Sequence, residues 1–217
     1  MQESKHMTDY KLSLRVRILE TAMKIFAQRG VKGTKMDDIA TTLAISKRTL
    51  YEIFDTKEQV LYEGVCYYHQ LRETELSAFA EDPAHDVLDI IVFLYGRHVK
   101  QSANVKPQFY HEITCYPRLQ QFIEEQKRRN AENFLTFIRR GIDEGLFLPD
   151  IDYQLIAHVF EAVGKYMNEQ HLYERYSFND LFFNMLFITL RGFCTTQGVA
   201  RLDQFFSEHR QRDNKTT

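Results

Sequence analysis

Apolar side chains recur every three or four residues along almost the whole of this 217-residue chain. In the first such segment, Leu14, Ile18, Ala22 and Phe26 share one face of a helix. The sequence shows no sustained alternation of apolar and polar residues, the pattern that indicates strands, and only 4 Pro and 9 Gly interrupt the helical spacing. The sequence therefore predicts an all-α protein of about nine helices.

Three helices are expected near the N-terminus. Gly30 follows the first helix and suits a left-handed position at its C-terminal end. Thr34, with Asp37 three residues later, is the expected N-cap of a short second helix. A tight turn at Ala44 then leads to Ser46, the expected N-cap of a third helix with the sequence KRTLYEIF. We expect these helices to form one small domain over residues 12–57.

The rest of the chain predicts a larger helical bundle over residues 58–208. Asp82, directly before Pro83, is the expected N-cap of one helix, and Gly145 is the expected end of another. The segment 209–217 is polar, and we expect it to be a disordered tail. The further helices are expected at 56–79, 82–101, 107–115, 117–144, 153–174 and 178–196.

The charge is unevenly distributed. Residues 1–57 contain eleven Lys/Arg and seven Asp/Glu, a formal charge of +4, whereas the whole chain has a net charge of −2. A basic N-terminal domain on an acidic body suits contact with DNA at one end of the molecule. The chain shows no apolar run long enough to span a membrane and no apolar leader, and its three cysteines are widely spaced, so we expect a cytoplasmic protein without membrane contact.

The second and third predicted helices, joined by a tight turn, have the arrangement of a helix-turn-helix, whose second helix enters the DNA major groove. Leu50 and Phe54 would face the core. Lys47, Arg48 and Thr49 would then stand free at the N-terminal end of the third helix, where Lys and Arg read guanine edges and Thr contacts a thymine methyl group. These three residues are the predicted base contacts, and double-stranded DNA is the predicted partner.

The segment 17–65 resembles the TetR family of bacterial regulators. The resemblance rests on GVKGTKMDDIATTLAISKRTLYEIFDTKEQVL, with Asp38-Ile39-Ala40 on the second helix and Thr49-Leu50-Tyr51 on the third. It implies a homodimeric transcriptional regulator, commonly a repressor, that a small molecule releases from a palindromic operator. It also implies phosphate contacts from Thr34, Tyr51 and Lys57. Ala44 departs from the pattern, because the family usually has glycine there, and a left-handed alanine costs about 1 kcal/mol.

The last two predicted helices carry apolar stripes, and each contains a glycine that permits close helix approach. The resemblance implies a four-helix dimer interface here, although the same stripes are compatible with core packing. The predicted interface residues are Ile156, Val159, Phe160, Val163, Gly164, Met167, Met185, Thr189, Gly192 and Phe193.

Aromatic residues are frequent in the middle of the chain, and a few polar side chains lie among them. Such a composition is compatible with an apolar pocket for an apolar or aromatic effector and equally with ordinary core packing. The candidate pocket residues are Phe93, His98, Phe109, Tyr110, Phe134, Phe137 and Tyr166.

Two other functions, a zinc enzyme and a protein-interaction module, are the alternatives to a DNA-binding regulator. His111-Glu112-Ile113-Thr114-Cys115 nearly matches the zinc signature H-E-x-x-H, but its last ligand is wrong and no third ligand stands out. We therefore expect neither catalysis, a metal nor a cofactor. The second alternative is a helical protein-interaction module without DNA binding. Salt distinguishes it, because binding through several phosphates weakens steeply as salt rises.

Overall fold

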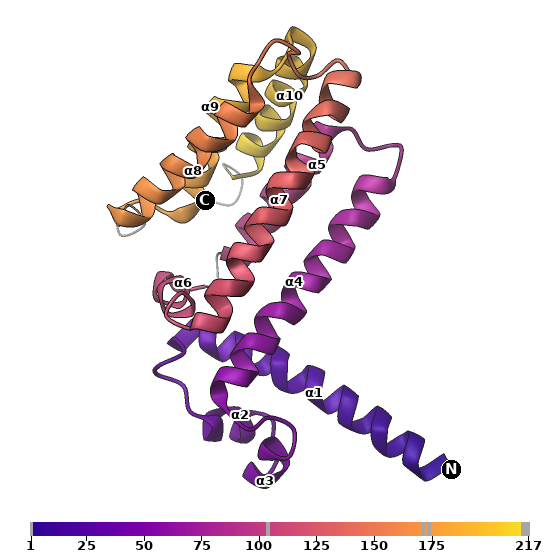
Figure 1. Cartoon of the computed structure of the whole chain (residues 1–217), viewed down its shortest axis with the longest axis vertical. Coiled ribbons are helices and arrows are strands. Elements are labelled where there is room, and N and C mark those ends of the chain that lie inside the picture. The colour runs from indigo at the N-terminus through magenta and orange to yellow at the C-terminus, as the bar shows by residue number, and fades with distance from the viewer. Residues whose placement is uncertain (1, 103–104, 171, 173–174, 214–217) are drawn as a thin grey trace. The chain divides into compact units, whose positions relative to one another are not determined.

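The computed structural model describes residues 2–102, 105–170, 172 and 175–213. Within these ranges the chain forms ten helices and no strand, which confirms the predicted fold class (Figure 1). The helices are α1 (Gln2–Arg29), α2 (Met36–Thr42), α3 (Lys47–Tyr51), α4 (Lys57–Glu81), α5 (Val87–Ser102), α6 (Pro107–Ile113), α7 (Pro117–Asp143), α8 (Tyr153–Glu169), α9 (Phe178–Phe193) and α10 (Thr196–Asp213).

The chain divides into two compact units. Unit 1 comprises Met1–Glu75 and Ala103–Glu124, and unit 2 comprises Leu76–Ser102 and Glu125–Thr217. Unit 1 is therefore larger than the domain predicted over 12–57, because it also contains the N-terminal parts of α4 and α7 and the whole of α6.

One apolar core holds unit 1 together. Phe26 of α1, Ile39 of α2, Leu50 of α3 and Leu61 of α4 are completely buried in it. Phe109 of α6 packs against the same cluster and is 7% exposed. The helix α6 is thus a structural part of the N-terminal unit, although α5 and its flanking segments, residues 82–106, separate it from α4 in the sequence.

Unit 2 has a second core, built mainly from α5, α7, α9 and α10. The Phe193 ring of α9 makes edge contacts with the rings of Phe147 and Tyr153, at centroid distances of 5.1 and 5.5 Å. Cys194 lies buried beside them, and this burial raises the pKa of its thiol to about 11. Its thiol therefore stays protonated at neutral pH.

Several helix ends follow the predicted signals. Gly30 and Gly145 have φ angles of +81° and +73° at the ends of α1 and α7, and the Ser46 hydroxyl accepts a hydrogen bond from the Thr49 backbone N–H at 3.0 Å. The predicted cap of α5 is wrong. Asp86, and not Asp82, accepts the N–H groups at the start of α5, while Asp82 closes a turn by accepting the Ala84 N–H at 2.9 Å.

Two boundaries differ further from expectation. The helix α1 begins at Gln2, ten residues before the predicted domain. The helix α10 was not predicted, and it extends to Asp213, beyond the start of the expected tail at His209. It packs against α5 and α9. Residues 214–217 of that tail lie outside the described residues.

Candidate nucleic-acid interface

The turn between α2 and α3 has the geometry of a helix-turn-helix. Ala44 adopts a left-handed conformation with φ +53°, so the turn keeps this conformation although alanine stands where the family usually has glycine. The next residue, Ile45, donates its N–H to the Ala40 carbonyl at 3.0 Å, which closes the end of α2. The chain then enters α3 at Ser46 without an intervening loop.

The core holds one side of α3. Leu50 and Phe54 are completely buried, so they fix the rotation of α3 about its axis. The Arg15 guanidinium of α1 lies over the Phe54 ring, 4.5 Å from its centroid, and donates to the Ile53 carbonyl at 3.3 Å. The opposite side of α3 therefore faces solvent.

The exposed side of α3 carries the predicted base contacts. The side chains of Lys47 and Arg48 are 66% and 89% exposed, and Tyr51 is 47% exposed beside them. Thr49 is half-buried, and its hydroxyl lies 2.8 Å from the Ser46 hydroxyl. Two cations and a phenol thus share the accessible face of a helix that is fixed from behind.

Both cations have a carboxylate partner within unit 1. The Lys47 ammonium forms an ion pair with Asp37 of α2, and a hydrogen bond to that carboxylate raises the pKa of the ammonium above its ordinary value. The Arg48 Nε lies 3.0 Å from Glu52, one turn later on the same helix. Contact with DNA would require both cations to exchange these partners.

Two of the predicted phosphate contacts have internal partners. The Thr34 side chain is completely buried, and its hydroxyl donates to the Gly30 carbonyl at 2.7 Å. The predicted N-cap role of Thr34 is wrong, because Lys35 precedes α2 and its N–H donates to Asp38 at 2.8 Å. The Lys57 ammonium donates to the carbonyls of Val31 and Thr34, both at 2.7 Å. Direct phosphate contacts from Thr34 and Lys57 stay a prediction.

Glu112, which lies in the incomplete zinc signature of the sequence, has a structural role in unit 1. Glu112 of α6 is 2% exposed, and its carboxylate accepts the backbone N–H groups of Val31 and Lys32. His111 and Cys115 are exposed. Among the residues that the structure describes, no group of three side chains could hold a metal ion.

The candidate pocket residues divide between the two units. Phe109 and Tyr110 belong to unit 1, whereas Phe93 and Phe137 belong to unit 2. Phe93 stacks on Phe79 at 4.3 Å, and Phe134 and Phe137 pack against the unit 2 core. His98 is half-buried on α5 of unit 2. Tyr166 is 58% exposed on α8.

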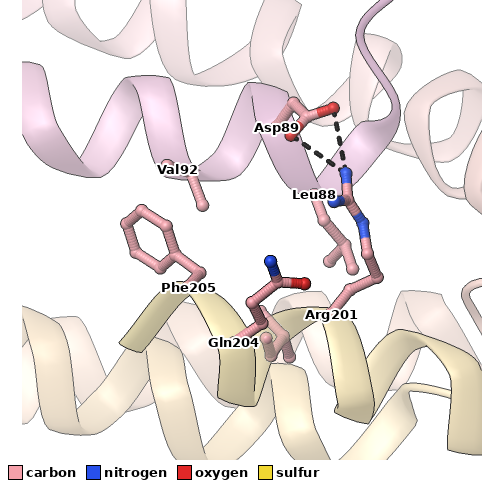
Figure 2. A pocket seen from close by; sticks show the side chains of 7 residues that line it. Leu88, Asp89, Val92, Arg201, Gln204 and Phe205 are labelled. Atoms are coloured by element: carbon pink, nitrogen blue, oxygen red, sulfur yellow. Dashed lines mark hydrogen bonds and ion pairs between the residues drawn. The ribbon is translucent and has the colours of Figure 1, made fainter. Parts of the chain in front are cut away.

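One cavity in unit 2, of about 140 Å³, lies between α5 and α10 (Figure 2). None of the candidate pocket residues lines it. The Arg201 guanidinium at its edge pairs with Asp86 at 2.9 Å and with Asp89 at 3.2 Å. The cavity is smaller than the roughly 300–1,000 Å³ of typical ligand pockets. Its lining consists of Leu88, Asp89, Val92, Arg201, Leu202, Gln204 and Phe205.

An apolar stripe is exposed along α8. We call Leu155, Val159, Val163 and Tyr166 the α8 stripe; they are 59%, 50%, 38% and 58% exposed. Spacings of four, four and three residues place them on one side of the helix. Leu155 precedes Val159 by one helical turn and was not among the predicted interface residues.

The other predicted interface residues, on α8 and α9, differ in their exposure to solvent. Gly192 is exposed, and a Cβ added there, or at Gly164 of α8, would meet no atom within 4 Å. Ile188, one turn before Gly192, was not predicted and is 69% exposed. Phe193 instead lies in the core, 5% exposed. The remaining predicted residues are half-buried: Ile156, Phe160, Met167, Met185 and Thr189.

Comparisons with known proteins agree with this geometry. Residues 18–63 match the sequence model of "Bacterial regulatory proteins, tetR family". The HTH-type transcriptional repressor KstR2 of Mycobacterium tuberculosis is 25% identical over 149 residues, which cover 66% of this chain and 74% of KstR2.

Solved structures share the fold. A TetR-family transcriptional regulator from Cytophaga hutchinsonii matches with a TM-score of 0.65 and 20% identity, covering 86% of this chain and 98% of its own. A transcriptional regulator from Saccharomonospora viridis in complex with choline matches with a TM-score of 0.61 and 23% identity. The match covers 79% of this chain and 96% of that regulator.

No helix within the described residues is both long and apolar enough to cross a membrane. The matched segment contains the whole helix-turn-helix, with its buried anchors and its exposed cations. The related proteins named above are transcriptional regulators. Residues 18–63 therefore form a helix-turn-helix similar to that of the TetR family of bacterial regulatory proteins, and the chain is a DNA-binding transcriptional regulator.

Proposed function

We propose that this regulator binds a palindromic operator as a homodimer, inserts α3 of each protomer into the major groove, and represses transcription until a small molecule releases it. The observation that carries the DNA contact is the two-sided character of α3. Leu50 and Phe54 anchor one side completely, and Lys47 and Arg48 project from the other. A recognition helix needs this combination of fixed orientation and exposed cations.

The α8 stripe supports the homodimer. Four apolar side chains are exposed on one face of α8, and Ile188 and Gly192 are exposed on α9, which is unusual for a monomer. The open space at Gly164 and Gly192 would let a second copy approach closely. Pairing then gives two recognition helices, which suits half-sites about 34–36 Å apart.

Two named relatives support control by a small molecule. One solved neighbour holds choline, and another is described as a ketosteroid transcriptional regulator. Unit 2 is rich in aromatic side chains, which suits an apolar or aromatic effector. A ligand lowers DNA affinity only if it binds better to a state that cannot engage both half-sites.

The experiment is selection of duplexes from a randomised library by the wild-type protein, followed by footprinting of the selected duplex and of the DNA flanking the protein's own gene. We expect a palindromic site whose affinity falls steeply with salt. Failure to enrich any sequence would refute the DNA-binding function and favour the protein-interaction module.

Two substitutions test the assignment of α3. Tyr51→Phe should weaken binding to all duplexes alike, because a phosphate contact carries no sequence information. Arg48→Ala should lower the preference at particular base pairs by about 1–3 kcal/mol. If both variants bound the selected duplex as the wild type does, α3 would not be the recognition helix.

A further inference from the structure

Glu112 is a carboxylate buried inside the DNA-binding unit. It is 2% exposed, and its partners are two backbone N–H groups and one side-chain amide. The Val31 N–H and the Lys32 N–H donate to Oε2, the second at 3.0 Å, and Gln108 Nε2 donates to Oε1 at 2.6 Å. Burial alone would raise the pKa of this carboxyl, but the hydrogen bonds from Lys32, Gln108 and Val31 outweigh it and lower the pKa. The side chain is therefore held as an anion.

The α1–α2 loop is shaped to receive this anion. Gly30 has φ +81°, and the two N–H groups that follow it point toward the same carboxylate oxygen. Successive N–H groups beside a left-handed residue form a concave anion-binding site. A Cβ added at Gly30 would lie 3.1 and 3.2 Å from the two Glu112 oxygens, so the glycine also leaves room for the carboxylate.

A cation holds the other side of the same loop. The Lys57 ammonium of α4 donates hydrogen bonds to the Val31 and Thr34 carbonyls. The loop from Gly30 to Thr34 is therefore fixed through its N–H groups by α6 and through its carbonyl groups by α4. This loop leads directly into α2, whose end determines where α3 begins.

The helix α6 reaches the loop from a distant part of the sequence. Val31 and Glu112 are 81 residues apart. The helix α6 is anchored on α1 by the Lys106 N–H, which donates to the Ala27 carbonyl at 2.9 Å, and by the buried Phe109. In the chain α6 follows α5 of unit 2 and precedes α7, which extends into unit 2. The contact made by Glu112 thus joins the loop before α2 to α6, which lies in the sequence between two segments of unit 2.

We propose that Glu112 is a positioning residue for DNA binding, which holds the α1–α2 loop in the conformation that presents α3 and the predicted phosphate-contacting residues to DNA. This inference rests on the proposed operator binding. Replacing the anion by a neutral amide leaves the two backbone N–H groups with an uncharged, weaker acceptor, and the loop can then rearrange around Lys57. The folded protein remains, but its helix-turn-helix no longer matches the duplex.

The test compares full-length Glu112→Gln with the wild type and with Glu132→Gln, which removes one exposed carboxylate from α7. The probe is the duplex that the wild type selects from a randomised library. Fluorescence anisotropy across a series of KCl concentrations gives the dissociation constant and its salt dependence. Hydrogen–deuterium exchange reports the loop, and circular dichroism reports the folded fraction.

We expect Glu112→Gln to bind about tenfold more weakly, in keeping with loss of hydrogen bonds to a charged group. Its slope of log affinity against log salt should be shallower by about 1, because at least one phosphate contact is lost. Exchange should accelerate in residues 31–35, and Glu132→Gln should match the wild type in every measurement.

A folded Glu112→Gln protein with wild-type affinity and salt slope would overturn the proposal. The proposal would also be overturned if the unfolded fraction of Glu112→Gln accounted for its whole loss of DNA affinity and the salt slope were unchanged. Glu112 would then only stabilise the fold. If Glu112→Gln does not fold, Gln108→Ala replaces it, because it keeps the carboxylate and removes one donor. We expect Gln108→Ala to lower the DNA affinity about threefold and to make the salt slope shallower. Wild-type affinity and slope would refute the positioning role. A wild type that selects no duplex refutes the proposed function instead.

Discussion

The Lys47 ammonium of α3 is paired with the Asp37 carboxylate of α2. Both side chains are largely exposed, so the pair itself adds little to stability. If Lys47 contacts DNA as proposed, it must leave Asp37 before it reaches a base or a phosphate. Asp37 would then oppose binding to every duplex, most of all to those that offer Lys47 no good partner.

Replacing Asp37 should reduce this discrimination. We expect Asp37→Asn to bind random-sequence DNA about threefold more tightly, with a smaller gain on the selected duplex. Competition binding at several salt concentrations measures both affinities. Asp9→Asn removes the same charge from an exposed position on α1 and serves as the control. Equal gains for the two variants would show that only net charge matters.

The left-handed Ala44 predicts a stabilising substitution. Its φ of +53° is unfavourable for a residue with a Cβ, and its side chain is exposed, so Ala44→Gly loses no packing. We expect the free energy of unfolding to rise by about 0.5–1 kcal/mol, measured by urea denaturation. Ala200→Gly, at an exposed position inside α10, should instead lower it by about 1 kcal/mol. If Ala44→Gly were less stable than the wild type, the left-handed backbone at Ala44 would not be a source of strain.

The pH dependence of stability should reveal the Glu112 anion. Hydrogen bonds lower the pKa of this carboxyl in the folded state despite its burial. Its contribution is therefore fully present above the unfolded pKa of about 4.3 and is lost as pH falls through the lower folded pKa.

At pH 7 we expect Glu112→Gln to be about 2 kcal/mol less stable than the wild type, and the difference should shrink as pH falls below about 4. Urea denaturation between pH 7 and pH 3 measures it. A difference that is constant with pH would mean that the charge of Glu112 contributes nothing.

The α8 stripe predicts the effect of a charge in the proposed dimer interface. Val159→Glu would place a carboxylate among apolar side chains, and burying it without a partner is costly. We expect light scattering after gel filtration to give a mass near 25.8 kDa for this variant and twice that for the wild type. Gln154→Glu adds a carboxylate to α8 away from the stripe and should remain dimeric. A dimeric Val159→Glu protein would place the interface elsewhere.

Local signals in the sequence predicted much of the fold. Gly30, Ser46 and Gly145 mark helix ends through properties of a single residue and its immediate neighbours, and the structure has all three as expected. The start of α5 was misplaced because Asp82 and Asp86 are equally good capping residues. The choice depends on Arg140 of α7 and on Glu144, directly after α7, which bind backbone groups on both sides of this turn.

Contacts between distant residues were beyond the sequence. Nothing near Glu112 indicates that its partners are N–H groups 81 residues earlier, and a lone glutamate on a short helix is usually exposed. Thr34 and Lys57 could be assigned only by resemblance, and their internal hydrogen bonds emerge only when the loop, α4 and α6 meet. Sequence periodicity identified α8 and α9 as amphipathic, but it could not separate the exposed Val159 from the buried Phe193.

The membership of α6 in unit 1 has a consequence for protein engineering. A fragment that ends after α4 would contain the complete helix-turn-helix motif and yet lack the carboxylate that occupies the α1–α2 loop and the Phe109 ring that closes the core. Exchanging recognition specificity between regulators of this family by swapping only the N-terminal segment would bring a foreign loop against the host's α6. Chimeras that transplant residues 103–124 together with the N-terminal segment keep the two halves of this contact from the same parent.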